Sequence, residues 1–404
     1  MEVIAKRCCG LDVHKRSVTA CLVTPKGKEI RQFGTLTSEL LKLADWLSEH
    51  KVTHVAMESA GVYWKPVYNL LEELDIELLL VNARHMKAVP GRKTDVKDAE
   101  WIADLLKHGL LKASFVPPRE QRELRELVRY RRGLIGQRAQ VSQRLQKVLE
   151  GANVKLANAV SDITGKTGLA ILRAMVAGEE DPQALSALAR GSLQAHRDRL
   201  EPALESRMGE HQRFMLGSLL KQLDFFDAEI EAVDQKVAEQ LADKDELIER
   251  LDAIPGIGRR VAEEVLAEIG TDMSRFASAK HLASWTRICP GNHESGGKHR
   301  HASIGPGNRW LRSALVEAAR AAAITKKSYL SAQYRRIRAR RGGKRAAVAI
   351  AHSILTIIYH LIRDGTTYED LGTEYFEERA RDRALHQSVK RIERLGYQVS
   401  VISP

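Results

Sequence analysis

The order of apolar segments in the first 115 residues constrains the fold more than any other feature of the sequence. Short runs rich in β-branched and apolar residues predict strands, and runs with apolar residues three and four apart predict amphipathic helices. The predicted strands are CCGLDVH, SVTACLVT, KEIRQFGTL, VTHVAMES and IELLLVN, and the predicted helices between the last three are SELLKLADWLSEH and VYWKPVYNLLEEL. Three antiparallel strands followed by two helix–strand pairs are typical of an RNase H-like α/β domain.

Carboxylates occupy unusual places in this pattern. Asp12 lies inside the first predicted strand among apolar residues, and Glu58 ends the fourth strand. An unpaired carboxylate in such a setting is costly. The segment KTDVKDAEW then opens a helix in which Asp95 and Asp98, three residues apart, share one face.

The first and fourth strands of an RNase H-like sheet are neighbours, so Asp12 and Glu58 can converge on the helix that carries Asp95 and Asp98. Four carboxylates held together repel one another unless cations lie between them. Hard oxygen ligands with room for water suit Mg²⁺, and a pair of such ions can hold a phosphodiester during displacement. Taken singly, Asp95 is also a first-turn helix acid, and Asp98 is also a partner for Lys97 or an arginine.

The middle of the chain is predicted to be helical. The basic segment 119–150 has an apolar stripe from Leu124 to Leu149, and its arginines are predicted on the opposite face, where they meet either solvent or nucleic acid. Residues 151–213 are weakly patterned, and no role follows for them. A heptad seam then predicts a coiled-coil arm, partnered by the 119–150 helix or by another protomer, with a plain amphipathic helix packed on a domain as the alternative. The seam residues are Leu216, Leu219, Leu223, Phe226, Ile230, Val233 and Val237.

A third unit begins at Leu251, where AIPGIGRRVAEEVLAEIG has the pattern of a helix-hairpin-helix. Exposed backbone N–H groups at Gly256 and Gly258, next to Arg259, can hold a phosphate, and a tight structural turn is the alternative. Further on, seven of the eleven residues of RRIRARRGGKR are basic, a density typical of polyanion contacts. These seven are Arg335, Arg336, Arg338, Arg340, Arg341, Lys344 and Arg345.

The composition favours the same class of partner. The chain has 64 Lys and Arg against 52 Asp and Glu, a formal charge of +12, which favours nucleic acid, with general solubility as the alternative. Its four cysteines form no CxxC pair and are predicted to be buried, reduced thiols. No signal peptide opens the chain and no run of about 18 apolar residues occurs, so we expect a soluble, cytoplasmic protein without a membrane contact.

The loop NHESGGKHRH, residues 292–301, leaves three interpretations open: a serine nucleophile, a histidine metal site or an ordinary polar loop. A serine hydroxyl needs activation, and no Asp and His stand at hydrolase-like positions. The spacing of His293, His299 and His301 is not a standard zinc pattern, and no cysteine pair accompanies it. Glycines beside Ser295 would let a DNA strand approach the backbone closely, where basic residues could stabilise developing phosphate charge. The basic residues beside the histidines are Lys298 and Arg300.

Six motifs occur in order over nearly the whole chain: GLDVHK, MESAGVYW, KTDVKDAEW, IPGIG, PGNHESGGKHRH and GNRWLR. With these motifs the chain resembles the transposases of insertion-sequence family one-ten, the DEDD transposases that act as bridge-RNA-guided recombinases. The resemblance implies a RuvC-like N-terminal domain with a Mg²⁺-binding carboxylate set, a coiled coil for assembly, and a mostly helical C-terminal transposase domain whose nucleophile is Ser295. The implied Mg²⁺ ligands are Asp12, Glu58, Asp95 and Asp98.

The sequence departs from the family pattern after the serine. The segment HASIGPGN has Gly305 and Pro306 where the family usually carries Lys or Arg ahead of the Gly-Asn pair. Asn308, Arg309 and Arg312 remain as candidates for contacts with phosphate.

The resemblance also implies a function and its partners. The protein would be a DNA recombinase that excises and inserts its own mobile element through a covalent phosphoserine link. Its implied partners are DNA of the element ends and target, a structured guide RNA, and further copies of the chain, as a dimer or as a tetramer in the synapse, on the bacterial nucleoid. Two alternatives stay open: a metal-dependent, Holliday-junction resolvase-like endonuclease that uses water, and a nucleic-acid-binding factor with a decayed site.

A division of the chain follows from the same resemblance. Residues 1–117 would form the RuvC-like domain, and residues 118–250 the linker, insertion and coiled coil. Residues 251–376 would form the transposase domain, and residues 377–404 a C-terminal tail.

Overall fold

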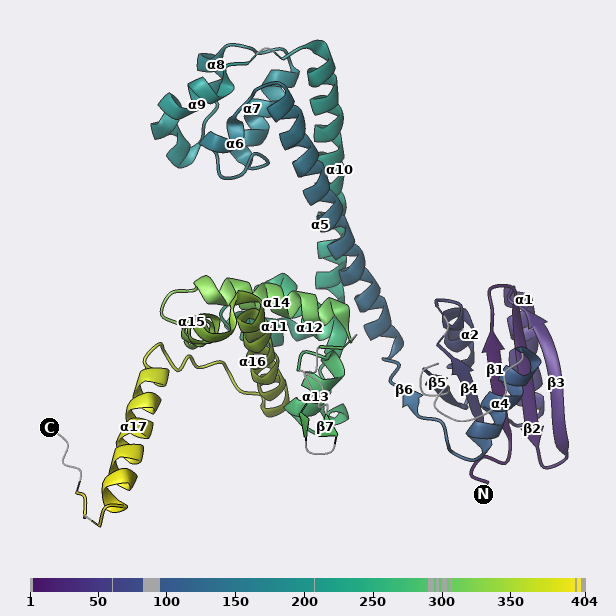
Figure 1. Cartoon of the computed structure of the whole chain (residues 1–404). Helices are drawn as coiled ribbons and strands as arrows, with labels where there is room; N and C mark the ends of the chain where they lie inside the picture. Colours follow the sequence, from purple (N-terminus) through teal and green to yellow (C-terminus); the bar gives the residue numbers. More distant parts are fainter. Residues whose placement is uncertain are drawn as a thin grey trace. The chain divides into compact units, whose positions relative to one another are not determined.

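The structure, a computed structural model, describes residues 3–59, 61–82, 95–206, 208–289, 294–295, 298–299, 304–305, 307–396 and 398–400. The chain divides into two compact units, Met1–Arg119 and Glu120–Pro404 (Figure 1). The first unit contains a mixed sheet with helices, and the second is almost entirely helical. The finer division at residues 250 and 376 stays a prediction.

The first unit is built on a six-stranded sheet with the order β3-β2-β1-β4-β5-β6. Strand β1 pairs antiparallel with β2 and β2 with β3, whereas β4 runs parallel to β1 and β5 parallel to β4. All five predicted strands are present, and β6, only two residues long, was too short for a pattern to predict. The strands are β1 Cys8–Val13, β2 Ser17–Thr24, β3 Gly27–Gly34, β4 His54–Glu58, β5 Glu77–Val81 and β6 Ala113–Ser114.

Helices cover both faces of this sheet. On one face, Leu11 and Val13 of β1 join the core formed with α1, Thr37–Glu49, and α2, Trp64–Leu71. On the other face, Cys8 of β1 joins the core formed with α4, Asp95–Lys107. Successive residues of a strand point to opposite faces, so the even-numbered positions of β1 face α4.

Glycine at position 10 lets α4 lie directly on β1. A Cβ added at Gly10 would lie 2.3 Å from the carbonyl oxygen of Ala99 and 2.4 Å from the backbone nitrogen of Ala103. Both are helix backbone atoms, so no side-chain rotation can relieve the clash. The helix that carries two of the predicted carboxylates is therefore placed by this one close approach.

The first prediction concerns this contact. Gly10→Ala should destabilise the first unit by about 1–3 kcal/mol, because the added methyl group forces α4 away from the sheet. The measurement is urea denaturation followed by circular dichroism. Gly136→Ala is the control, since no atom lies within 4 Å of the position its Cβ would take in an exposed helix. It should leave stability unchanged or raise it by up to about 1 kcal/mol. Equal effects of the two substitutions would contradict the close approach at Gly10.

Two long antiparallel helices, α5, Arg119–Gly151, and α10, Glu210–Gln240, form the arm of the second unit (Figure 1). Arg131 pairs with Asp234 at 2.8 Å, and Arg138 pairs with Asp227. The two pairs are seven residues apart on each helix and in opposite order, which fixes the antiparallel register. The predicted seam on α10 is thus partnered by the 119–150 helix of the same chain.

The 151–213 segment closes one end of this arm (Figure 1). Leu145 and Leu149 of α5 share a core with Leu219 of α10 and with Ile171 and Leu200 of the inserted helices. The segment therefore has a packing role that its weak pattern did not predict. Its helices are α6 Leu156–Ala159, α7 Lys166–Val176, α8 Pro182–Ala187 and α9 Arg197–Leu204, with a 3₁₀ helix, η1, at Gly191–His196.

The other end of the arm packs into a larger helical core. Helix α16 is long and apolar enough by composition to cross a membrane, but Ile350, Ile354 and Ile358 on one side of it are fully buried in that core. Such burial is typical of a central helix in a globular unit. The helices here are α11 Asp245–Asp252, α12 Arg259–Ile269, α13 Ala279–Thr286, α14 Arg309–Ile324, α15 Tyr329–Arg341, α16 Gly343–Asp364 and α17 Tyr375–Glu393, with 3₁₀ helices η2 Ala242–Lys244 and η3 Met273–Arg275.

The prediction of buried, reduced thiols is confirmed for the three cysteines of the sheet. Cys8, Cys9 and Cys21 are buried and free, and Cys289 is half-buried and free. Burial raises the pKa of both Cys8 and Cys21 to about 11. These thiols are therefore neutral at physiological pH and act as core residues.

Candidate active site and nucleic-acid interface

Asp12 and Glu58 lie side by side at the ends of neighbouring strands. Strands β1 and β4 run parallel with Leu11 opposite Met57, so the next residue on each strand is one of the two acids. Two residues earlier, Gly10 lies opposite Ala56, and both belong to the side of the sheet that α4 covers. The strand alternation therefore places both acids on the α4 side, as the sequence predicted.

The first turn of α4 lies level with these two acids. The Cys8 thiol is 3.8 Å from the carbonyl oxygen of Ala103, and Gly10 lies against Ala99 and Ala103. Moving along β1 toward Asp12 thus means moving toward the beginning of α4. Two strand residues advance about 6.6 Å and four helix residues about 6 Å, so Asp12 comes level with the turn that starts at Asp95.

Asp98 is half-buried in that turn, whereas the side chain of Asp95 lies outside the described residues. Among the side chains that are described, no three from His, Cys, Asp and Glu form a group that could hold a metal ion. The side chain of Asp95, the fourth member of the predicted set, is not among them. The backbone nevertheless brings the four positions to one end of one face of the sheet.

Asp12 has a neighbour that the sequence analysis missed. Nε2 of His14 lies 2.9 Å from Oδ2 of Asp12, whose side chain is 13% exposed, while His14 is 58% exposed. The signal was present in GLDVHK, since residues two apart on a strand share a face. His14 can orient the carboxylate by donating a hydrogen bond to it.

Ser295 lies in a short hairpin of the second unit. Strand β7, Glu294–Ser295, pairs antiparallel with β8, Lys298–His299, so that Ser295 lies opposite Lys298. Side chains of this hairpin lie outside the described residues, as do His293, Gly296, Arg300, His301 and Pro306 in full. The three interpretations of the loop therefore stay open, and the serine nucleophile stays a prediction.

The base of the serine loop is tightly packed. Arg287 ends α13 in a left-handed conformation with φ of 57°, and a Cβ at Gly307 would lie 2.5 Å from its Cβ and 2.6 Å from the carbonyl oxygen of Thr286. Arg312 donates to the carbonyl oxygen of Gly305 at 3.1 Å. Gly307, the glycine of the Gly-Asn pair, therefore lets the two ends of the loop meet. One nitrogen of the Arg312 guanidinium is therefore already engaged in a hydrogen bond within the fold.

Asn308 fixes the end of the loop. Its side-chain oxygen accepts hydrogen bonds from the backbone N–H groups of Trp310 and Leu311, which caps α14. Its amide donates to Glu268 at 2.6 Å, and the Glu268 side chain is only 2% exposed and is also held by Arg129 through bonds of 2.8 and 2.9 Å. These bonds give Asn308 a structural role, and its predicted contact with phosphate stays a prediction.

The second prediction follows from this cap. Asn308→Ala should destabilise the second unit by about 2–4 kcal/mol, because about 1 kcal/mol of capping is lost and a buried carboxylate loses a donor. Ser278→Ala is the control, since Ser278 caps α13 at an exposed site, and it should cost only about 1 kcal/mol. Thermal denaturation of the two variants provides the comparison. Equal losses of stability in the two variants would show that the hydrogen bond from Asn308 to Glu268 contributes no stability.

Five arginines of α5 are paired inside the second unit, which makes the predicted placement on a free face wrong for them. Arg131 is 1% exposed and donates to Glu263 at 2.6 Å as well as to Asp234. Arg132 donates to Glu264 at 2.7 Å. Arg125 donates to the carbonyl oxygen of Ala267 at 2.8 Å, and burial lowers its pKa to about 10. These side chains join α5 to α12.

A matched pair of arginines provides the third prediction. Arg131→Leu should cost about 3–5 kcal/mol, because Glu263, itself almost fully buried, would lose its partner. Arg138→Leu removes an arginine that also pairs with α10, but both partners are partly exposed, so it should cost less than about 1 kcal/mol. Urea denaturation distinguishes the two. A small loss for Arg131→Leu would mean that Glu263 is readily solvated.

Comparisons with known proteins support a single family. A family model for DEDD transposases of the IS110 type, described as "Transposase", matches residues 9–154, and a second, described as "Transposase IS116/IS110/IS902 family", matches residues 248–335. The chain belongs to the IS110 family of transposases. This confirms the family that the sequence motifs resemble, and the chain is therefore a DNA-transposing enzyme.

Named relatives agree with this assignment. The chain is 28% identical over 322 residues to a probable family 20 transposase of Pseudomonas aeruginosa, covering 78% of this chain and 85% of the relative. It is 25% identical over 369 residues to the transposase for insertion sequence element IS1111A of Coxiella burnetii, covering 89% and 90%. A pilin gene-inverting protein of Moraxella bovis is 36% identical over 122 residues, covering 30% of this chain and 38% of the relative.

The predicted helix-hairpin-helix turn of the transposase has a packing explanation. Gly256 has φ of 88°, and a Cβ there would lie 2.2 Å from the carbonyl oxygen of Ala318 in α14. Gly258 begins α12, and Arg259 pairs with Asp245 at 2.7 Å and with Glu263 at 3.1 Å. The tight structural turn is thus supported, and phosphate binding at this turn stays a prediction.

The basic run at the end of α15 and the start of α16 differs from that of α5. Its seven basic residues, Arg335 to Arg345, are all exposed, and none of them forms an ion pair with any residue that the structure describes. Arg309 is also exposed and lies 4.8 Å from the ring centroid of Trp310. Unpaired surface cations are what binding to a phosphate backbone requires. Part of the unpaired positive charge of the transposase therefore lies on α14, on α15 and at the start of α16.

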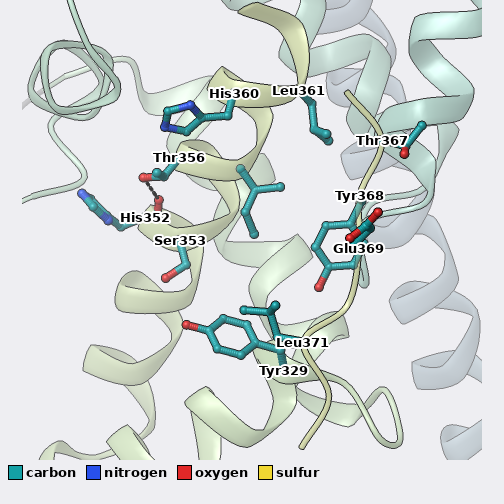
Figure 2. Close-up of a pocket in the computed structure, with 11 residues that line it drawn as sticks. Tyr329, His352, Ser353, Thr356, His360, Leu361, Thr367, Tyr368, Glu369 and Leu371 are labelled. Carbon is teal, nitrogen blue, oxygen red and sulfur yellow. Dashed lines mark hydrogen bonds between the residues drawn. The ribbon is translucent and has the colours of Figure 1, made fainter. Parts of the chain in front are cut away.

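A pocket beside α16 does not share this chemistry (Figure 2). Its volume is about 540 Å³, and His352, Thr356 and His360 of α16 line it together with Tyr368. The Tyr368 hydroxyl donates to Asp370 at 2.8 Å, and burial together with this carboxylate raises the pKa of Tyr368. None of the predicted site residues whose side chains are described lines the pocket.

Proposed function

We propose that this transposase cleaves and exchanges DNA strands through a covalent link between Ser295 and a DNA phosphate. The carboxylates Asp12, Glu58, Asp95 and Asp98 would assist by binding Mg²⁺. The observation that carries the proposal is the convergence of the strand ends holding Asp12 and Glu58 on the first turn of α4. Its first unit would be RuvC-like, with the strand order of the sheet as support.

The chemistry of the donor set fits a hard divalent cation. Carboxylate oxygens at the ends of β1 and β4 are the ligand type that Mg²⁺ prefers. When bound, Mg²⁺ would neutralise phosphate charge and stabilise a leaving oxygen. His14 would keep the Asp12 carboxylate oriented through their 2.9 Å contact. Asp98 is half-buried, which limits the water that competes for its oxygens.

Ser295 would act as the nucleophile. Its hydroxyl oxygen forms a bond to phosphorus as the bond from phosphorus to a sugar oxygen breaks, and the hydroxyl proton ends on that leaving oxygen. Attack by a second sugar hydroxyl reverses the step and joins new ends, so the phosphodiester energy is conserved. The packed base of the loop at Arg287 and Gly307, together with the Asn308 cap, would hold the hairpin in place for this attack.

The remaining parts of the proposal concern partners. A structured guide RNA would pair with donor and target DNA, while basic helices hold its backbone and shape. Copies of the chain would assemble as a dimer and as a tetramer in the synapse, so that carboxylates and serine from different copies meet. The turn at Gly256 would act as a helix-hairpin-helix contact.

The fourth prediction is a covalent trap. The full chain, the element-end RNA and a labelled DNA junction are mixed with Mg²⁺ and separated on a denaturing gel. We expect a protein–DNA adduct from wild type, none from Ser295→Ala, and a loss of at least about 10²-fold in rate from Asp12→Asn, because charge stabilisation of the displaced oxygen is lost. Asp104→Asn, which removes an exposed carboxylate from the same α4, should leave the rate unchanged.

One outcome would support the alternative enzyme. If wild type releases free cleaved ends without an adduct and Ser295→Ala cleaves equally well, water is the nucleophile. The chain would then work like a metal-dependent junction endonuclease with Ser295 as a bystander.

A further inference from the structure

The turn between α14 and α15 forms a second basic feature that the motifs did not single out. A hollow of about 840 Å³ lies there, lined by Thr325 in the turn, by Ser331 of α15 and by Phe376 at the start of α17. Four cations also line it, and two of them, from the turn itself, lie outside the predicted basic run. The four are Lys326, Lys327, Arg335 and Arg336, here called the basic basin.

Among the described side chains, no acid balances this charge. None of the described Asp and Glu side chains lines the basin, and its four cations form no ion pair with any described residue of the chain. A neighbouring hollow along α14 contrasts with it, because Arg132 there is paired with Glu264 and Glu317. Concentrated cations without internal partners are stabilised by an external polyanion.

The walls of the basin are preformed. Tyr329 stacks on Phe376 with ring centroids 5.0 Å apart, and the Arg336 guanidinium lies 5.4 Å from the Phe376 centroid. Lys327 has φ of 57°, a left-handed conformation that a residue with a side chain adopts at a cost. Ser328 caps α15, and Asp370 accepts from the backbone N–H of Tyr329 at 2.8 Å. Two backbone N–H groups at the start of α15 thus already have hydrogen-bond acceptors, so a ligand would be held by the side chains of the basin.

The basin and the end of the serine loop lie at opposite ends of α14. Helix α14 begins at Arg309, directly after the loop ends at Asn308, and finishes at Ile324, directly before the turn. Its 16 residues extend about 24 Å at 1.5 Å per residue. Duplex DNA advances about 3.4 Å per base pair, so this length corresponds to about seven base pairs.

We infer that the basic basin binds the phosphate backbone of DNA about seven base pairs from the phosphate that Ser295 attacks. This rests on the proposed function, since Ser295 defines the point from which the distance is counted. DNA is favoured over guide RNA because the same helix, α14, carries the basin at one end and the serine loop at the other. The basin would therefore fix the register of the flanking duplex relative to the cleavage position.

Binding is tested first, without chemistry. Full-length Ser295→Ala protein with guide RNA is bound to duplex DNA carrying the element end, over a series of salt concentrations. Adding Lys326→Ala and Lys327→Ala should lower the slope of log affinity against log salt by about 2, as expected for two lost phosphate contacts. Lys236→Ala with Lys244→Ala is the control, because each lysine is already paired with a neighbouring acid, and it should leave the slope unchanged.

Position is tested with single neutral methylphosphonate linkages placed one at a time along the flank. We expect weakened binding when the neutral linkage lies about six to eight base pairs from the mapped cleavage position, and no further weakening there in the Lys326→Ala, Lys327→Ala protein. A scan without position dependence, or a loss of affinity for guide RNA alone, would overturn the inference. If an adduct forms at Ser295 but binding does not depend on the position of the neutral linkage, only the inference about the basic basin is rejected. If binding weakens at the expected position but no adduct forms, only the serine mechanism is rejected.

Discussion

Buried arginine–glutamate pairs between α5 and α12 determine how the second unit is assembled. Arg131 and Glu263 are both almost completely removed from solvent, and five residues further along α12 the buried Glu268 is held by the partly exposed Arg129. Buried pairs contribute little net stability, but a misaligned helix would leave an isolated charge in the interior at high cost. One register of α5 on α12 is therefore strongly preferred. Through Glu268 the same contacts reach Asn308, where the serine loop joins α14.

The two arginine-rich segments show what a sequence pattern can and cannot establish. Segment 119–150 and segment 335–345 are both rich in arginine. They differ because three glutamates of α12, more than 100 residues away in the chain, meet the first segment and none of the described acids meets the second. Composition alone cannot distinguish internal ion pairs from a free binding surface, since the acids come from a distant element.

Features that depend on local periodicity were predictable. Alternation along β1 and β4 placed Asp12 beside Glu58, and the heptad spacing of α10 located its interface, although the partner helix had to come from the structure. Features that depend on tertiary approach were not. The closeness of α4 to Gly10 and the role of residues 151–213 both arise from packing between segments.

The antiparallel register of α5 and α10 has a consequence for how the length of the arm can change during evolution. Because pairs seven residues apart on one helix match pairs seven residues apart on the other, a residue inserted into one helix alone would rotate every later side chain by about 100° away from its partner. Lengthening or shortening is tolerated only in whole heptads, and in both helices together. The lengths of two segments separated by some sixty residues are therefore expected to covary among relatives.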